Sequence, residues 1–106
     1  MYSWGMNFNG QLGIQSVKRL RTIPTRVPIQ HKIMQIGCGG NYSMALTGDG
    51  LLLGWGDNQL GQLGVGSLES FLSIPQIVGI SSIVDFSCGW FHVMALSKEG
   101  HLFCWG

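Results

Sequence analysis

The sequence predicts an all-β fold in which a four-stranded unit occurs twice in tandem, as in the blades of a β-propeller. Three observations carry this prediction. The pair Trp-Gly, followed by a glycine-rich turn, occurs at Trp4 and again at Trp55, 51 residues later. The apolar segments between these turns are too short for typical helices, and Gly, Asn, Asp or Pro bounds each of them. A radial propeller repeats such a blade and buries both of its faces against neighbouring blades.

The four strands of each unit are expected in the same order. The first starts at a proline, which is tolerated at the start of a strand on a sheet edge. The last two are joined by a turn at hairpin spacing. Leu51-Leu52-Leu53 shows no polar alternation, so both faces of that strand should be covered. The expected segments are 24–27, 33–36, 43–46 and 51–55, with their counterparts in the second unit, where 75–78 is the edge strand.

One residue has been lost between the two units. Matched residues are 51 apart up to Val27 and Val78, but 50 apart from Ile33 and Ile83 onward. A loop is predicted between Val78 and Ile83, because a one-residue shift inside a strand would turn every side chain to the wrong face. We expect repeats at about 5–56 and 57–106, preceded by a strand remnant at 1–4.

Composition predicts that the chain does not cover its own apolar surface. Apolar residues make up 45% and charged residues 10% of the sequence, whereas about 25% charged residues is typical of a soluble domain. Additional propeller blades or self-association should cover the remaining faces. The charge is also divided, because residues 1–56 carry five cations and one carboxylate, a net +4, and residues 57–106 carry one cation and four carboxylates, a net −3.

Location inside the cell, in the cytoplasm or nucleus, is expected from two absences. No apolar run approaches the ~20 residues that span a bilayer. The start of the chain lacks the basic and apolar regions of a secretory signal.

The three cysteines show no C-x-x-C pattern, so no metal or redox role is predicted. Cys38 and Cys88 occupy matching positions and are expected to be small buried residues of the fold.

The repeated residues resemble a known family. The pattern W-G-x-N-x-x-G-Q-L-G, then P-x-x-V, G-x-x-H-S-L-A-L-T-x-D-G and W-G, is similar to the repeat of the regulator of chromosome condensation family. The matching segments are Trp4–Asn7, Gly10–Gly13, Gly39–Gly50, Gly61–Gly66 and Gly89–Leu96. Tyr42 stands where the family usually has histidine, and His92 retains that histidine in the second unit.

This resemblance implies a β-propeller of that type used as a binding platform. Family members usually build seven blades, and about two blades' worth is present here. The founding member is similar to an exchange factor for a nuclear small GTPase that also docks on nucleosomes. Many relatives look like adaptors or appendages of ubiquitin ligases and kinases, so family membership alone does not select a function.

No catalytic, cofactor or metal site is predicted. Gly56 and Gly61 have the spacing of a phosphate-binding loop, but Gln62 and Leu63 follow where Lys and Ser or Thr are required. These glycines are expected to supply turns instead. No histidine is placed with a nucleophile and an orienting group, and His92 is expected to make a structural hydrogen bond in its blade. We therefore expect a non-enzymatic chain.

A basic segment is the first candidate for protein binding. Lys18, Arg19 and Arg21 are expected in the loop after the first glycine turn, and the matching loop of the second unit contains Glu69 and no basic residue. The fold therefore does not require these cations. A solvated loop and contact with an acidic partner both remain open. Nucleic acid is the weaker option, because only three cations cluster and no aromatic residue lies between them.

An aromatic pair is the second candidate. Trp90 and Phe91 occupy a turn in which the first unit has Gly40 and Asn41, so the repeat does not demand large side chains there. Tryptophan is favoured as an anchor of protein interfaces. The alternative is that both rings pack on an adjacent blade.

Together these features predict a protein–protein interaction module within a larger or oligomeric propeller. A guanine-nucleotide exchange factor for a small GTPase and a structural segment without independent activity are the alternatives. The exchange factor is disfavoured, because the loops 14–23 and 65–74 are too short to hold an inserted wedge.

Overall fold

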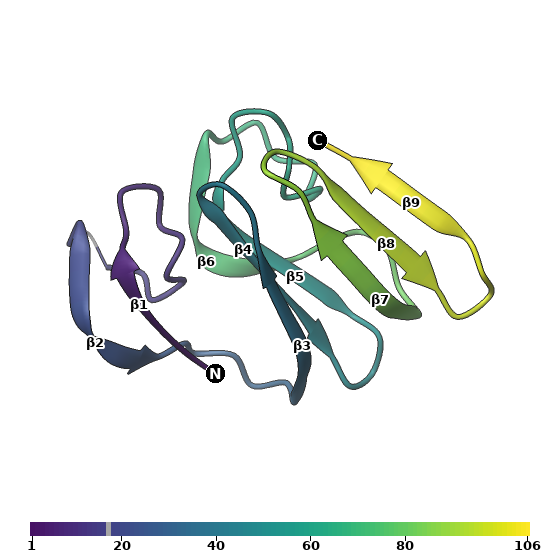
Figure 1. Ribbon diagram of the computed structural model, residues 1–106, viewed down its shortest axis with the longest axis horizontal. Coiled ribbons are helices and arrows are strands. Elements are labelled where there is room, and N and C mark those ends of the chain that lie inside the picture. The colour runs from purple at the N-terminus through teal and green to yellow at the C-terminus, as the bar shows by residue number, and fades with distance from the viewer. Residues whose placement is uncertain (17) are drawn as a thin grey trace.

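The computed structural model describes residues 1–16 and 18–106, which form nine strands in three antiparallel sheets (Figure 1). The N-terminal sheet has the order β1-β2, the central sheet β3-β4-β5-β6 and the C-terminal sheet β7-β8-β9. The strands are β1 (Tyr2–Met6), β2 (Leu20–Arg26), β3 (Ile33–Cys38), β4 (Tyr42–Thr47), β5 (Leu52–Asp57), β6 (Phe71–Ile77), β7 (Ile83–Cys88), β8 (Val93–Ser97) and β9 (Leu102–Trp105). The all-β prediction is confirmed. This part of the chain holds no helix, and hence none able to span a membrane.

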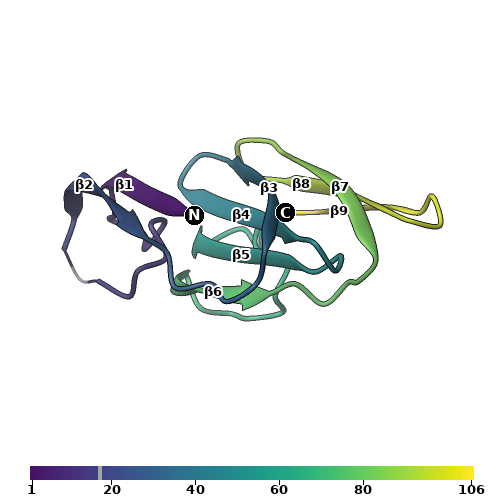
Figure 2. The same ribbon diagram turned by 90° about the horizontal axis from the view of Figure 1, so that it is seen from below.

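The sheets follow one another as layers, with the central sheet between the other two (Figures 1 and 2). One core cluster, which includes Met44 and Leu52 of the central sheet and Val93 and Ala95 of the C-terminal sheet, lies between those two sheets. A smaller cluster around Trp55 lies on the side of the central sheet that faces the N-terminal sheet. The central sheet is therefore covered on both faces, as a propeller blade requires.

The sheets are out of phase with the sequence repeats. The first strand of the second repeat, β6, pairs with β5 of the first repeat and completes the central sheet. In the same way β2 pairs with β1, the strand that precedes the first repeat. Instead of two complete four-stranded blades, the described residues therefore form one complete blade flanked by a two-stranded and a three-stranded part of its neighbours.

Three sequence predictions about the strands agree with the structure. The proline-containing strands β2 and β6 lie at sheet edges, but the expectation that they start at Pro24 and Pro75 is wrong, because pairing with β1 and β5 extends them back to Leu20 and Phe71. All six residues of β5 are buried. The lost residue falls in the connection between β6 and β7, which spans 78–82, whereas the equivalent connection between β2 and β3 spans 27–32. The strand registers on either side are preserved because the loop absorbs the change.

The Trp-Gly pairs at Trp4 and Trp55 each form a β-bulge. The register of β1 against β2 shifts between Ser3 and Gly5, and the register of β5 against β6 shifts between Gly54 and Gly56. Gly5 and Gly56 have positive φ angles of 105° and 103°. Glycine adopts this conformation without steric cost, so the dipeptide is explained by the bulge that it builds.

The glycine-rich turn after each bulge is held by one asparagine. The Asn58 side chain donates to the carbonyl oxygens of Ser67 (3.1 Å) and Glu69 (3.0 Å), and its Oδ1 accepts from the Leu63 amide (3.3 Å). Asn7 makes the equivalent bonds in the first turn. The turn thus exposes a glutamine carbonyl to the next sheet. Trp55 Nε1 donates to Gln11 O (2.8 Å) and Trp105 Nε1 to Gln62 O (2.9 Å).

We predict that Gly13→Ala destabilises the fold by about 1–3 kcal/mol more than Gly61→Ala. Both glycines have φ near +70°, so both substitutions carry the same backbone strain. A Cβ at Gly13 would lie 2.7 Å from Trp55 Nε1, whereas nothing lies within 4 Å of a Cβ at Gly61. Urea unfolding of the two variants measures the difference. Equal losses would show that the contact with the Trp55 ring has no energetic weight.

Candidate protein-interaction surface

Both candidate segments lie at the same end of the molecule. The connections β1–β2, β3–β4, β5–β6 and β7–β8 all emerge at the end that also carries the C-terminus (Figure 1). Trp90 and Phe91 occupy the β7–β8 turn, and Lys18 and Arg19 occupy the β1–β2 connection. The central sheet separates the sheets that carry them. The structure therefore places the two segments on one face without bringing them together.

The Trp90–Phe91 pair is exposed and ordered by its neighbours. Trp90 is 67% exposed and Phe91 43% exposed. Their ring centroids are 6.2 Å apart at an interplanar angle of 74°, an edge-to-face arrangement that aromatic pairs favour. The Gly40 amide of the central sheet donates to the Trp90 carbonyl at 3.0 Å. A Cβ at Gly40 would lie 2.9 Å from Trp90 Nε1, so the indole rests against the glycine backbone of the adjacent blade.

Tyr42 holds the turn that carries this pair. Its hydroxyl lies 2.8 Å from the carbonyl oxygen of Gly89 and 2.7 Å from that of His92, and it donates its one proton to them across the blade boundary. The Tyr42 ring is buried. A Cβ at Gly39 would overlap that ring, which explains why glycine precedes it. Burial, followed by the neighbouring Cys88, raises the pKa of Tyr42 above its ordinary value, so the hydroxyl keeps its proton.

We call the hydrogen bonds from the Tyr42 hydroxyl to the Gly89 and His92 carbonyl oxygens the Tyr42 latch. It was not predicted from the sequence, although the unusual residue at position 42 could have indicated it. Tyr42 departs from the histidine of the repeat, and His92 retains it. The exposed His92 imidazole lies against Gly89. The hydrogen bond expected from this imidazole is absent among the contacts of the described residues, and the His92 carbonyl accepts from Tyr42 instead.

The basic segment is divided between a loop and a strand. The expectation that Lys18, Arg19 and Arg21 share one loop is wrong, because β2 begins at Leu20 and its pairing with β1 takes in Arg21. Arg21 Nε donates to Thr25 Oγ1 at 3.0 Å. The Arg19 guanidinium lies 5.6 Å from the centre of the Phe8 ring, within the range of a cation–π contact. Lys18 is exposed.

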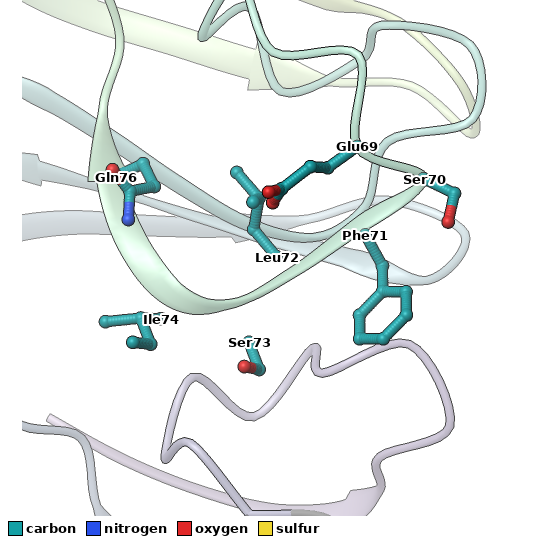
Figure 3. A pocket seen from close by; sticks show the side chains of 7 residues that line it. All are labelled: Glu69, Ser70, Phe71, Leu72, Ser73, Ile74 and Gln76. Atoms are coloured by element: carbon teal, nitrogen blue, oxygen red, sulfur yellow. The ribbon is translucent and has the colours of Figure 1, made fainter.

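Arg19 also lines a cavity of about 520 Å³ between the first glycine turn and β6. A second cavity, of about 560 Å³, follows β6 itself and shares Phe71 and Ser73 with the first. Figure 3 shows its lining, with Phe71, Ser73 and Ile74 on the side of β6 that faces the first glycine turn. The lining of both cavities mixes polar and apolar side chains with one charged group each, Arg19 in the first and Glu69 in the second. In the described residues no group of three His, Cys, Asp or Glu side chains is placed to hold a metal ion.

The prediction of two buried structural cysteines is wrong for Cys38. Cys88 is half-buried and lies against Gly37 at the boundary between the central and C-terminal sheets. Cys38 is exposed and lines a hollow beside Trp4. The physical reason is that the N-terminal sheet has no strand opposite β3 to cover it. All three cysteines are free.

Comparison with known proteins identifies the repeat. The model of the regulator of chromosome condensation (RCC1) repeat matches residues 1–46 and 49–96, and a second model of the same repeat matches residues 33–62. The chain belongs to the regulator of chromosome condensation repeat family. The resemblance found in the sequence is thereby confirmed, whereas the repeat boundaries 5–56 and 57–106 stay a prediction.

Curated relatives of the RCC1 repeat family match along the whole chain. The ultraviolet-B receptor UVR8 of Arabidopsis thaliana is 36% identical over 110 residues, covering 100% of this chain and 25% of the receptor. The probable E3 ubiquitin-protein ligase HERC4 of Homo sapiens is 35% identical over 111 residues, covering 100% of this chain and 10% of the ligase. The chain thus spans between a tenth and a quarter of the length of these relatives.

Solved structures show the same architecture. Human WBSCR16 superposes with a TM-score of 0.89 at 27% identity, covering 99% of this chain and 28% of that one. Yeast RCC1 (Prp20), in its complex with Kap60, superposes with a TM-score of 0.89 at 22% identity, covering 99% of this chain and 27% of that one. The three sheets are therefore successive parts of an RCC1-type β-propeller.

Proposed function

We propose that this chain is a non-enzymatic protein–protein interaction module that docks a partner protein on the Trp90–Phe91 pair. The observation that carries the proposal is an indole that is 67% exposed and yet held in place. The Gly40 amide fixes the backbone of Trp90, and the Tyr42 latch fixes the turn on both sides of the pair. Such a side chain loses little conformational freedom when a partner covers it.

The chemistry of the pair suits an interface anchor. Tryptophan is enriched among the few residues that carry most of the binding energy of protein interfaces. Its Nε1–H gives direction to an otherwise apolar contact. The equivalent turn of the first repeat carries Gly40 and Asn41, so the fold itself does not need two aromatic rings here. The partner is expected to offer an apolar pocket with a hydrogen-bond acceptor at its rim.

The basic residues supply a second, weaker contribution. Lys18 and Arg19 lie on the same face as the pair but on the N-terminal sheet, so a partner that meets both must extend across the central sheet. Exposed charges of this kind act mainly on the association rate and on its salt dependence. We propose that they favour partners with an acidic surface, and that nucleic acid is not the ligand.

The comparisons support binding rather than a chemical step. Yeast RCC1 (Prp20) was solved bound to Kap60, and the structure of Prp20p is described together with its binding to Gsp1p and histones. HERC4 is described as a probable ubiquitin-protein ligase, yet this chain matches only 10% of it. For this chain we propose docking without nucleotide exchange, since the connections β1–β2 (7–19) and β5–β6 (58–70) are equally short and neither carries an inserted segment. The free cysteines support a reducing compartment, the cytoplasm or nucleus.

We predict that Trp90→Ala weakens binding of the partner at least tenfold while leaving the free energy of unfolding within about 1 kcal/mol of the parent chain. Phe71→Ala is the matched control, because Phe71 is a half-exposed aromatic ring on β6. The probes are Kap60, Gsp1p and histones, each titrated against the immobilised chain and the two variants. Equal binding by Trp90→Ala and the parent would overturn the assigned site, and absence of binding to every probe would contradict the proposed function.

A nucleotide-release assay with Gsp1p distinguishes docking from nucleotide exchange. Gsp1p is loaded with a fluorescent guanine nucleotide, and its release is followed with and without catalytic amounts of the chain. An exchange factor binds the nucleotide-free GTPase more tightly than the loaded form, and so accelerates release. We expect no acceleration. Release that depends on Trp90 would establish the exchange factor instead.

A further inference from the structure

The first glycine turn and β6 enclose a cleft at the boundary between the N-terminal and central sheets. We call it the Arg19 cleft; its volume is about 520 Å³, and Phe8, Gln15, Arg19 and Ser73 are among the residues that line it. Ser73 faces the turn from β6 (Figure 3). Both walls lie well inside the chain, because the turn connects the paired strands β1 and β2, and β6 is the edge strand of the four-stranded central sheet. The cleft therefore belongs to this blade boundary itself.

Backbone contacts hold the two walls of the cleft together. The Gln15 amide donates to the Ser73 carbonyl oxygen at 3.1 Å. A Cβ at Gly10 would lie 2.7 Å from the Cα of Ser73, so the turn packs directly against the strand. The Asn7 amide donates to the Arg19 carbonyl oxygen at 2.8 Å and fixes the backbone that carries the guanidinium. The cleft is thus formed before a ligand arrives, which limits the conformational freedom that binding removes.

Comparison of the two repeats separates the scaffold of the Arg19 cleft from the residues added to it. Half of the lining residues from the first turn recur 51 positions later in the second turn, namely Asn7, Gly10 and Ser16, as Asn58, Gly61 and Ser67. The other half change, namely Phe8, Gln15 and Arg19, to Gln59, Gly66 and Ser70. The first set is common to both turns, whereas the second turn forms without the second set. The fold therefore does not explain why these three side chains line the cleft.

Gln15 occupies a backbone conformation that suits glycine. Its φ angle is +52°, and Gly66 at the matching position has a φ angle of +71°. A residue with a Cβ is strained in this left-handed region, and strained residues of this kind gather at functional sites. The sequence therefore places a carboxamide on the wall of the cleft at a position where glycine would fold with less strain.

Arg19 brings a positive charge into the cleft that its walls do not neutralise. The guanidinium lies 5.6 Å from the centre of the Phe8 ring, which holds one face of the group. The other described lining residues are neutral, and no carboxylate is among them. A guanidinium presents several N–H donors in one plane, in a geometry that matches the two oxygens of a carboxylate. The cleft thus offers charge complementarity to an acidic side chain.

We propose that the Arg19 cleft binds a glutamate or aspartate side chain from an extended segment of a partner protein. The carboxylate accepts hydrogen bonds from the Arg19 guanidinium and the Gln15 carboxamide, and the Phe8 ring contacts the methylene groups of the acid. This inference rests on the proposed function, protein docking on this face of the molecule. It gives the acidic partner a defined site that is separate from the Trp90–Phe91 pair.

The test uses a short peptide of glycine and serine, capped at both ends, with a central glutamate between two leucines. A control peptide carries glutamine in place of the glutamate. Each peptide is titrated into the full chain, and NMR follows the Nε–H signal of Arg19, which reports contact with the guanidinium directly. We expect the glutamate peptide to shift this signal. The glutamine peptide should bind at least about tenfold more weakly, because it lacks the charge-assisted hydrogen bond.

Three variants of the full chain test the assigned residues, with binding followed at the backbone amide of Ser73. Arg19→Gln should weaken binding of the glutamate peptide at least about tenfold. Lys18→Gln is the matched control, because it removes the same charge from the neighbouring exposed residue, and it should change the affinity less than about twofold. Gln15→Gly inserts the residue of the second repeat. It should weaken binding by about twofold to tenfold without loss of stability, because it removes a hydrogen-bond donor and the backbone strain together.

Circular dichroism checks that each variant is folded. Equal binding of the two peptides, equal losses in Arg19→Gln and Lys18→Gln, or an unchanged affinity in Gln15→Gly would each overturn the proposal. The result also distinguishes this inference from the proposed function. A chain that binds a probe protein through Trp90 but does not bind the glutamate peptide contradicts the inference alone. A chain that binds the peptide but none of the probe proteins contradicts the proposed function alone.

Discussion

Replacing Trp55 by alanine is expected to lower the free energy of unfolding by about 3–5 kcal/mol, the range for removing a buried aromatic side chain. Trp55 is fully buried between the N-terminal and central sheets. Its Nε1 donates to the Gln11 carbonyl at 2.8 Å, and its ring fills the space that Gly13 leaves open. The substitution therefore opens a cavity and removes a bond that joins two blades. Urea unfolding followed by circular dichroism measures the loss.

Trp4→Ala is the matched control, because Trp4 occupies the same repeat position on an exposed face. The free energy of unfolding of the Trp4→Ala variant should fall by less than about 1 kcal/mol at concentrations where the chain is not associated. A comparison of the two variants isolates the effect of burial from the effect of residue type. If both variants lost the same stability, the Trp55 side chain would not be part of the packed core.

Replacing Tyr42 is expected to have the second largest effect. Tyr42→Ala should cost about 3–5 kcal/mol, because it empties the space of a buried ring. Tyr42→Phe keeps the ring and should cost about 1–3 kcal/mol, because the carbonyl oxygens of Gly89 and His92 lose their donor. Since the latch joins the central sheet to the β7–β8 turn, hydrogen exchange at Gly89 should accelerate more than exchange within β5. Uniform acceleration across both would contradict the role of a latch.

The pH dependence provides an independent check of the latch. The pKa of Tyr42 lies above its ordinary value of 10.0, so the folded state keeps a proton that the unfolded chain releases above about pH 10. Burial also raises the pKa of the Cys88 thiol from 9.0 to about 11. Stability contributed by both groups is complete below pH 9 and falls as pH rises through these values. Tyr42→Phe should remove the part of this fall due to Tyr42 and leave a fall due to Cys88 between about pH 9 and 11.

Much of the fold follows from local patterns in the sequence. The glycine-rich turn depends on residues no more than 11 positions apart, and the edge position of β6 follows from its own proline, so both could be predicted without a structure. The spacing of 51 and then 50 located the loop that absorbs the lost residue. The candidate pair Trp90–Phe91 was found by comparing the two repeats, because its rings have no counterpart in the first.

Contacts between blades join residues that lie far apart in the sequence. The Tyr42 latch joins residues 47 and 50 positions apart, and no local pattern encodes that approach. Arg21 was assigned to a loop because the sequence marks the start of β2 only weakly, whereas pairing with β1 extends the strand back to Leu20. Cys38 and Cys88 match in sequence but differ in exposure, since only one of them meets a neighbouring strand.

The sequence by itself determined the repeat, its turns and the all-β propeller class, because these arise from side chains and backbone angles close together in the chain. The tertiary structure decided which strands share a sheet and which faces are covered. The segment Met-Ala-Leu occurs at 44–46 and again at 94–96. Met44 and Leu46 are buried, while Met94 and Leu96 are exposed. The residues are the same, and the difference lies in whether another sheet packs against them, which is a property of the assembled blades.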